Sequence, residues 1–198
     1  MGKRSPENIT LGSGDVFIKE FTAESGVPKH TDICQPENML GRIKGGATLT
    51  YTEETYEEKD DLGYVSKVVT TSEEALLKLG LITWNGETLQ KLADRCTVTP
   101  GDGIRTINIG GAGNSQGKEW VVCFHHIDKK DGDLWVIIRG RNNVGLTLTF
   151  AVDAGTVLEP EFKALPLDDK GTLISIIEET EAATEAATEA GEIELVEE

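Results

Sequence analysis

A glycine-rich segment, Gly110–Gly117, is the first place where the sequence could carry chemistry, because Lys118 follows it. A phosphate-binding loop would need a glycine where Ala112 stands and a serine or threonine where Glu119 stands. It would also lead into a helix, whereas the residues that follow here have the composition of a strand. Gln116 likewise replaces the third glycine of the dinucleotide-binding fingerprint. We therefore interpret the segment as the turn of a β-hairpin.

Two neighbouring histidines and a group of aspartates are the candidate metal ligands. His125 and His126 are adjacent in a segment with strand composition, so their side chains point to opposite faces and cannot share a metal ion. Asp128, Asp131 and Asp133 approach the spacing of a calcium loop without completing it. A turn between two strands accounts for them better than a bound cation. The sequence therefore predicts no metal and no cofactor.

The cysteines offer no framework for chemistry either. Cys34, Cys96 and Cys123 are odd in number, scattered, and without the spacing of a zinc site. This usage is typical of free thiols in a reducing cytosol, and we interpret Cys96 and Cys123 as small buried hydrophobic residues. Since no nucleophile, acid–base or metal set converges, the sequence predicts a protein that is not an enzyme.

Charge and length narrow the class of protein. The chain has 198 residues and a formal net charge of −16. Its length suits one domain with a sizeable core, which we place at residues 13–177. Such acidity argues against dedicated nucleic-acid binding, because that needs Lys and Arg to neutralise phosphates. Residues 178–198 hold nine acids and no base, and predict a solvated low-complexity tail. Residues 1–12 predict a flexible arm, and no apolar stretch is long enough to span a membrane.

The most regular pattern runs through residues 41–84 and predicts one very long β-hairpin. Residues 43–52 alternate small or apolar residues with threonines, and residues 64–71 are rich in β-branched residues. Residues 73–84 suit a helix by propensity, and we favour a strand there. An arm of this length exceeds what the domain itself needs, so we expect its acidic tip to contact another subunit. The tip residues in question are Glu53, Glu57, Glu58, Asp60, Asp61 and Leu62.

The hairpin is predicted to have one polar and one apolar face. Strand alternation places Ala47, Leu49 and Tyr51 together, and we expect them to pack inward with Val69 of the partner arm. A slip of one residue in the pairing would exchange the two faces. The opposite, polar face is predicted to face water. It comprises Thr48, Thr50, Thr52, Glu54, Ser66, Thr70, Ser72 and Glu74.

The remaining pattern predicts a mainly β fold with two packed antiparallel β-sheets, in a sandwich or barrel-like arrangement, and one flanking helix. The helix is expected over residues 85–96 with Asn85 as its N-cap. Its apolar stripe comprises Leu89, Leu92, Ala93 and Cys96. Residues 22–40 predict an irregular loop. Further strands are predicted at 15–21, 105–109, 120–127, 134–139, 146–152, 157–158, 161–165 and 173–177.

In order and spacing, these features resemble the major tail tube proteins of long-tailed bacteriophages. The likeness covers residues 10–177 and leaves out the acidic tail. The segments that carry it are Leu40–Leu49, the acidic tip ending at Gly63, Glu73–Lys78, Leu81–Gly86 before the helix, and Glu161–Pro166.

The resemblance implies a structural virion protein. Six subunits would form a ring whose strands close an inner β-barrel, and rings would stack into a hollow tail tube. The implied partners are other copies of the chain, a tape measure protein and tail-end proteins. The tail would be assembled in the cytoplasm of the bacterial host. The polar hairpin face would line the channel, and phage DNA would pass through without specific binding. Exposed strand edges support this expectation independently, because barrel closure removes them.

Two other classes of protein stay open. The first is a monomeric β-sandwich binding module, for instance one that recognises carbohydrate, which would need an exposed aromatic platform. Trp120 and Trp135 lie in strongly apolar segments and are expected to be buried instead. The second is an enzyme, for which the sequence offers no convergent set of catalytic residues.

Overall fold

A computed structural model describes residues 9–10 and 12–180 of the chain. Most of the predicted arm at 1–12 and of the predicted acidic tail at 178–198 therefore lies outside the described residues.

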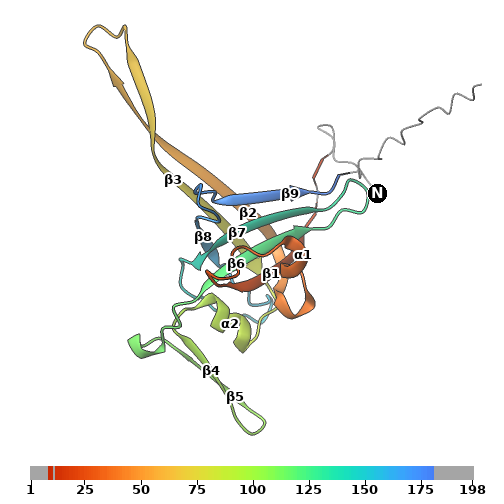
Figure 1. The fold of residues 1–198 in the computed structure, drawn as a ribbon. Helices are drawn as coiled ribbons and strands as arrows, with labels where there is room; N and C mark the ends of the chain where they lie inside the picture. Colours follow the sequence, from red (N-terminus) through yellow and green to blue (C-terminus); the bar gives the residue numbers. More distant parts are fainter. Residues whose placement is uncertain (1–8, 11, 181–198) are drawn as a thin grey trace, which may run out of the picture.

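Antiparallel strand pairing closes the body of the protein into a barrel (Figure 1). The strands follow the order β6-β1-β2-β3-β8-β7, and β7 pairs back with β6 to complete the circuit. A further strand, β9, pairs with the first half of β7. The predicted antiparallel, mainly β fold class is confirmed, and its large sheet takes the barrel form. The strands are β1 Gly14–Phe21, β2 Met39–Lys59, β3 Ser66–Leu81, β6 Glu119–His126, β7 Leu134–Asn142, β8 Glu161–Leu165 and β9 Ile174–Glu178.

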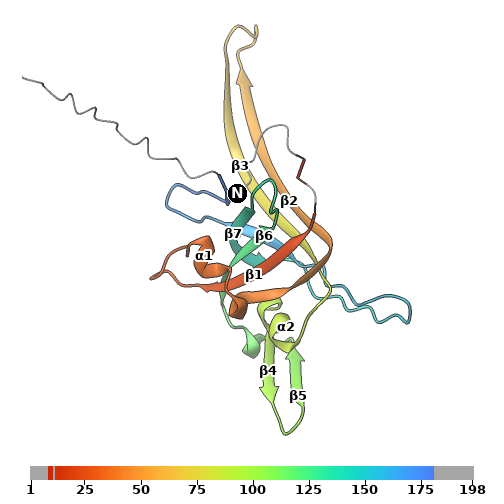
Figure 2. The same cartoon turned by 90° about the vertical axis from the view of Figure 1, so that its right-hand side faces the viewer.

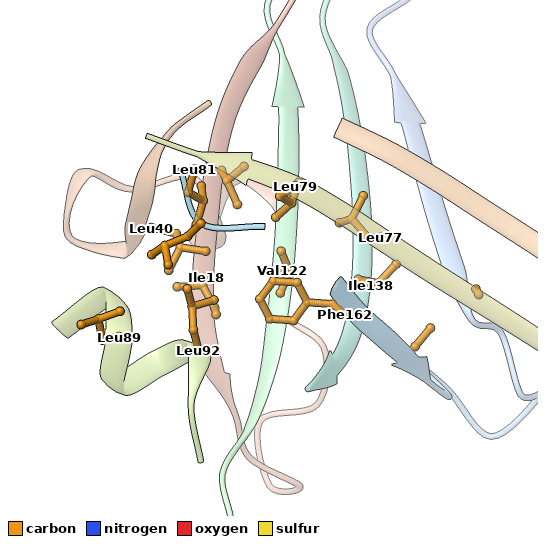
Figure 3. Packing of buried hydrophobic residues seen from close by; sticks show 14 of the residues in the cluster. Ile18, Leu40, Leu77, Leu79, Leu81, Leu89, Leu92, Val122, Ile138 and Phe162 are labelled. Carbon is orange, nitrogen blue, oxygen red and sulfur yellow. The ribbon is translucent and has the colours of Figure 1, made fainter. Parts of the chain in front are cut away.

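Strict alternation along the barrel strands builds two hydrophobic clusters, one on each side of the sheet. In β1, Val16 and Ile18 belong to the inner cluster, and Phe17 between them belongs to the outer one. Figure 3 shows the inner cluster, in which Phe162 of β8 packs near Val122 of β6. Because both sides of these strands are covered, β6 and β7 read as continuous apolar runs.

A short segment between β1 and β2 helps to cover the outer cluster. It contains the helix α1, His30–Ile33, and a 3₁₀ turn at Pro36–Asn38. Ile33 is fully buried against β1 and β6. The prediction of a wholly irregular loop at 22–40 was therefore wrong, because Ile33 supplies an apolar anchor for one helical turn.

The predicted helix begins as expected and ends early. The helix α2 spans Gly86–Leu92. Asn85 is its N-cap, and its side-chain oxygen accepts a hydrogen bond from the Thr88 amide at 2.9 Å. Cys96 lies outside the helix, in the strand β4, Cys96–Pro100, which pairs with β5, Arg105–Ile109. The sequence-based helix over 85–96 was too long, because the β-branched residues after Cys96 form a separate two-stranded sheet.

Two of the predicted strands, at 146–152 and 157–158, do not form. Residues 146–152 alternate clearly in sequence, yet the structure holds them in an irregular arm between β7 and β8. Only Leu158 near the end of that arm makes a β-bridge, with Leu81. Figure 2 shows this light-blue arm extending away from the barrel. Alternation alone cannot form a strand where no described neighbour offers an edge.

Candidate assembly surface

The β2–β3 hairpin extends far beyond the barrel (Figure 1). β2 pairs with β1 only at Met39–Arg42, and β3 pairs with β8 only at Leu76–Lys78. Residues 51–59 and 66–75 pair only with each other, so this two-stranded part is about 30 Å long at ~3.3 Å per residue. The strand prediction for 73–84 is confirmed up to Leu81.

Two glycines allow β2 to leave the barrel wall. Between Ile43 and Ala47 the pairing with β3 shifts at a β-bulge. Gly45 and Gly46 there have φ angles of +91° and +87°, which residues with a side chain rarely adopt. The bulge bends the long strand as it passes from barrel wall to hairpin.

The barrel end of the hairpin has the predicted two faces. Ala47 and Leu49 pack against the inner cluster, opposite the buried Leu79 and Leu77. Thr48 and Thr50 point the other way and are exposed. The inward assignment fails for Tyr51, which lies beyond the barrel and is 46% exposed.

The predicted polar face forms on β2 up to Glu54 and on β3 from Ser72 onward. Thr52 stands directly opposite Glu74, and Glu54 stands opposite Ser72. The Ser72 hydroxyl donates a hydrogen bond to the Glu54 carboxylate at 2.9 Å. Because directly opposed residues share a face, these four side chains and Thr50 lie on one side of the hairpin, where Glu74 is half-buried and pairs with Lys163.

A second bulge separates the remaining predicted members from this face. Thr71 is the extra residue, since Glu54 pairs with Ser72 and the next residue, Thr55, pairs with Thr70. Ser66 accordingly stands opposite Lys59, so Thr70 and Ser66 share a face with odd-numbered residues of β2. Placing them with Thr50 was wrong, because a single inserted residue reverses the alternation.

The same bulge corrects the assignment of Val69. It stands opposite Tyr56 and is 41% exposed, instead of packing inward with Leu49. Val68 shares the other face with Glu57 and is also exposed. The outer half of the hairpin thus exposes apolar side chains on both faces.

The hairpin carries a dense negative charge. Glu53 and Glu73 stand directly opposite each other, a like-charge pairing that weakens an isolated hairpin. The Tyr51 hydroxyl donates to the Glu53 carboxylate at 2.6 Å. This hydrogen bond, with the charges of Glu53 and Glu73, raises the pKa of Tyr51 to about 12. Residues 50–75 contain eight acidic and two basic residues, so their net charge is 2 − 8 = −6.

The tip is a preformed turn that displays apolar side chains. Asp60 holds it by accepting, through its carboxylate, a hydrogen bond from the Val65 amide at 2.8 Å. The Asp60 amide in turn donates to the Val65 carbonyl at 3.0 Å. Leu62 is 74% exposed, Tyr64 83% and Val65 69%. Sequence reasoning selected Leu62 and the acids but missed Tyr64 and Val65, although both lie next to the turn signal.

The arm between β7 and β8 is a second exposed apolar surface. Phe150 is 75% exposed and Val152 fully exposed. Leu146 and Leu148, nearer the barrel, pack against the inner cluster. Leu158 at the other end of the arm is buried in the same cluster, so both ends of the arm pack against the barrel while Phe150 and Val152 between them stay exposed.

The glycine-rich loop binds a carboxylate of the chain itself. It joins β5 to β6, so it is not a hairpin turn, and it contains a 3₁₀ turn at Ala112–Asn114. The Asp94 carboxylate accepts hydrogen bonds from the Ser115 hydroxyl at 2.5 Å and the Gly117 amide at 2.8 Å. The Ser115 bond, followed by the loop amides, lowers the pKa of Asp94. These two donors, which an external anion would need, already bind Asp94.

The histidines and aspartates likewise serve structural contacts. His125 stacks on Trp135 and its Nε2 lies 2.9 Å from the Asp133 carboxylate. His126 is buried, and its Nδ1 lies 3.0 Å from the Ser13 carbonyl. Asp128 accepts hydrogen bonds from two backbone amides of its own turn. Among the described residues no group of three or more His, Cys, Asp or Glu is placed to hold a metal ion.

Comparison of the sequence with models of known protein families and with curated proteins gives no match. Within residues 9–10 and 12–180, no helix combines the length and the apolar character that crossing a bilayer requires.

Proposed function

We propose that this chain is a self-assembling structural subunit of the phage tail tube type. Its copies form rings, with six subunits as the resemblance implies, and the rings stack into a hollow tube that conducts DNA. The observation that carries the proposal is the β2–β3 hairpin, whose outer edges have no partner among the described strands.

Unpaired edges of this length need a partner. Each exposes backbone N–H and C=O groups that pair readily with another strand. Among the described strands, none pairs with the outer edge of β2 from Ile43 onward or with that of β3 from Ser66 to Ala75. If β2 of one copy pairs with β3 of the next, the contact repeats around a ring and closes into a barrel without edges. The pairing stays antiparallel, as within the chain.

The polar face suits the wall of a channel for DNA. Thr48, Thr50 and Thr52 are exposed and uncharged, and Glu54 adds negative charge beside them. The two lysines of this face are both paired with acids, Lys163 with Glu74 and Lys78 with Glu159. Duplex DNA carries one phosphate per about 1.7 Å of axis, so an acidic wall repels it and lets it slide. The opposite face, with Leu49 and Leu77, faces the barrel core.

The two ends of the molecule carry projecting elements through which stacked rings could contact each other. In Figures 1 and 2 the long hairpin projects from one end of the barrel, and the β4–β5 sheet projects from the other. Leu62 and Tyr64 at the hairpin tip are exposed, as is Ile104 in the β4–β5 turn. A head-to-tail contact between opposite ends does not close, so it propagates as a filament.

Shortening the hairpin tests the proposal. Residues 53–73 can be replaced by Asn-Gly, because Thr52 and Glu74 are directly opposed and a two-residue turn can join them. We expect a folded monomer that forms neither rings nor tubes. The three tryptophans all lie outside the deleted part, so their fluorescence reports whether the barrel is intact. Normal tubes from the shortened chain would contradict an assembly role for the hairpin.

A further inference from the structure

Two thiols from distant parts of the chain meet on the outer side of the barrel. The Sγ atoms of Cys34 and Cys123 lie 3.6 Å apart, although 89 positions separate the residues in sequence. Cys34 follows the last residue of α1, and Cys123 lies in the middle of β6. All three cysteines of the chain are free thiols in this structure.

The two thiols differ in their surroundings. Cys123 is fully buried in the outer cluster, between Val121 and Ile137 among others, whereas Cys34 is partly exposed at its edge. The hydrogen bond from Cys123 lowers the pKa of Cys34 despite its partial burial. The same bond, together with burial, raises the pKa of Cys123. Cys34 is thus the thiol that forms a thiolate more readily and that a small oxidant can reach.

We propose that Cys34 and Cys123 are a site of reversible oxidation, at which a peroxide converts the two thiols into an intramolecular disulfide. The Cys34 thiolate attacks one peroxide oxygen, so an S–O bond forms, the O–O bond breaks and water leaves after protonation. The Cys123 sulfur then attacks the Cys34 sulfur, the S–S bond forms and the S–O bond breaks, releasing a second water. The two thiols lose two electrons and two protons, and one hydrogen peroxide becomes two waters.

The bond would attach the segment before the long hairpin to the barrel. Cys34 lies five residues before Met39, where β2 begins, and Cys123 is paired within the barrel wall to Phe17 and Ile137. A cross-link between such distant positions restricts the unfolded chain and so stabilises the folded one. This inference rests on the thiol geometry and does not depend on the proposed assembly.

The test is to treat the full-length protein with hydrogen peroxide, quench, unfold it and count the remaining thiols. We expect the count to fall from three to one, with a peptide joining Cys34 to Cys123 in the mass spectrum. The melting temperature of the treated protein should rise and return to its starting value after dithiothreitol. Three remaining thiols, or Cys34 recovered as a sulfinic acid or joined to another molecule, would overturn the proposal.

Three variants separate this pair from general oxidation. Cys96 lies in the inner cluster, away from the pair, so Cys96→Ala should still lose both of its thiols. Cys34→Ser should keep both of its thiols under the same treatment. Cys123→Ala should keep the Cys96 thiol and form no internal disulfide, because its Cys34 stops at the sulfenic acid. Loss of both thiols in Cys34→Ser, whose changed side chain is only partly buried, would show that Cys34 is not the reacting partner.

Discussion

The phenol of Tyr51 lies beside two carboxylates at the point where the hairpin leaves the barrel. The pKa of Tyr51 is raised to about 12, and the largest cause is its hydrogen bond to Glu53. Absorbance at 295 nm should therefore show a tyrosine transition near pH 12, well above the ordinary value of about 10. The hydrogen bond to Glu58 also raises the pKa of Tyr56, so the Tyr51 transition is the one that the two variants below must move. Glu53→Gln should return that transition toward the ordinary value, and Tyr51→Phe should remove it. An unchanged transition in Glu53→Gln would contradict the contact.

The sign of the effect on stability follows from the direction of the shift. Because the folded state holds the Tyr51 proton more tightly, the contact stabilises the fold at pH values below about 10. Its contribution falls as the pH rises through about 12, when the phenol ionises in the folded state as well. Since the side chain is solvent-exposed, added salt should weaken the shift.

The predicted channel wall can be tested by adding positive charge to it. Thr50→Lys combined with Thr52→Lys should permit tubes that retain short duplex DNA on sedimentation at low salt, because each lysine releases counterions from the DNA. Thr22→Lys with Thr31→Lys is the matched control, since both threonines are exposed on the barrel body. Equal DNA retention by the two double variants would contradict a channel position for Thr50 and Thr52.

At this scale the sequence predicts side-chain direction well until the pairing changes. The alternation around Leu49 and Thr50 is enough to assign faces, because one side of the barrel wall must be apolar. The extra residue Thr71 cannot be recognised from its type, since threonine suits any strand position. Ser66 and Thr70 were therefore placed on the wrong face.

Among the elements, the arm between β7 and β8 exposes two large apolar side chains that a neighbouring subunit could cover. Phe150 and Val152 are exposed, and burial of such side chains in a contact contributes about 1.5–3 kcal/mol each. Phe150→Ser with Val152→Ser should therefore raise the concentration needed for assembly by at least tenfold, measured by light scattering. The thermal midpoint of the monomer should stay unchanged. If assembly is unaffected, the arm is not a contact between subunits.

Most predicted strands that have a neighbouring strand in the chain form, and the predicted strand that has none among the described residues does not. The strands near 15–21, 120–127, 134–139, 161–165 and 173–177 all form, since each pairs with a strand of the barrel. Residues 146–152 have equal alternation but no described partner. The end of α2 was missed because the apolar stripe continues through Cys96 after the helix has given way to a turn. The tertiary position of Cys96, and not its spacing, decides its state.

At the scale of the whole molecule, the sequence predicts the fold class but not the contacts that depend on how the strands are packed. The mainly β class, the flanking helix and the protruding hairpin were all readable from periodicity and turn signals. The thiol pair was not, because Cys34 and Cys123 meet only once β6 and α1 are packed together. The free hairpin edges are likewise a property of the strand order, which sequence alone leaves undetermined.

The central claim is that one purified chain assembles by itself, and electron micrographs across a concentration series test it most directly. We expect monomers at low concentration and hollow tubes of uniform diameter at high concentration, with ring-shaped end views that enclose a channel. The hairpin-shortened variant at the same concentrations supplies the control. A protein that stays monomeric at millimolar concentration, with neither rings nor tubes in the micrographs, would contradict the account.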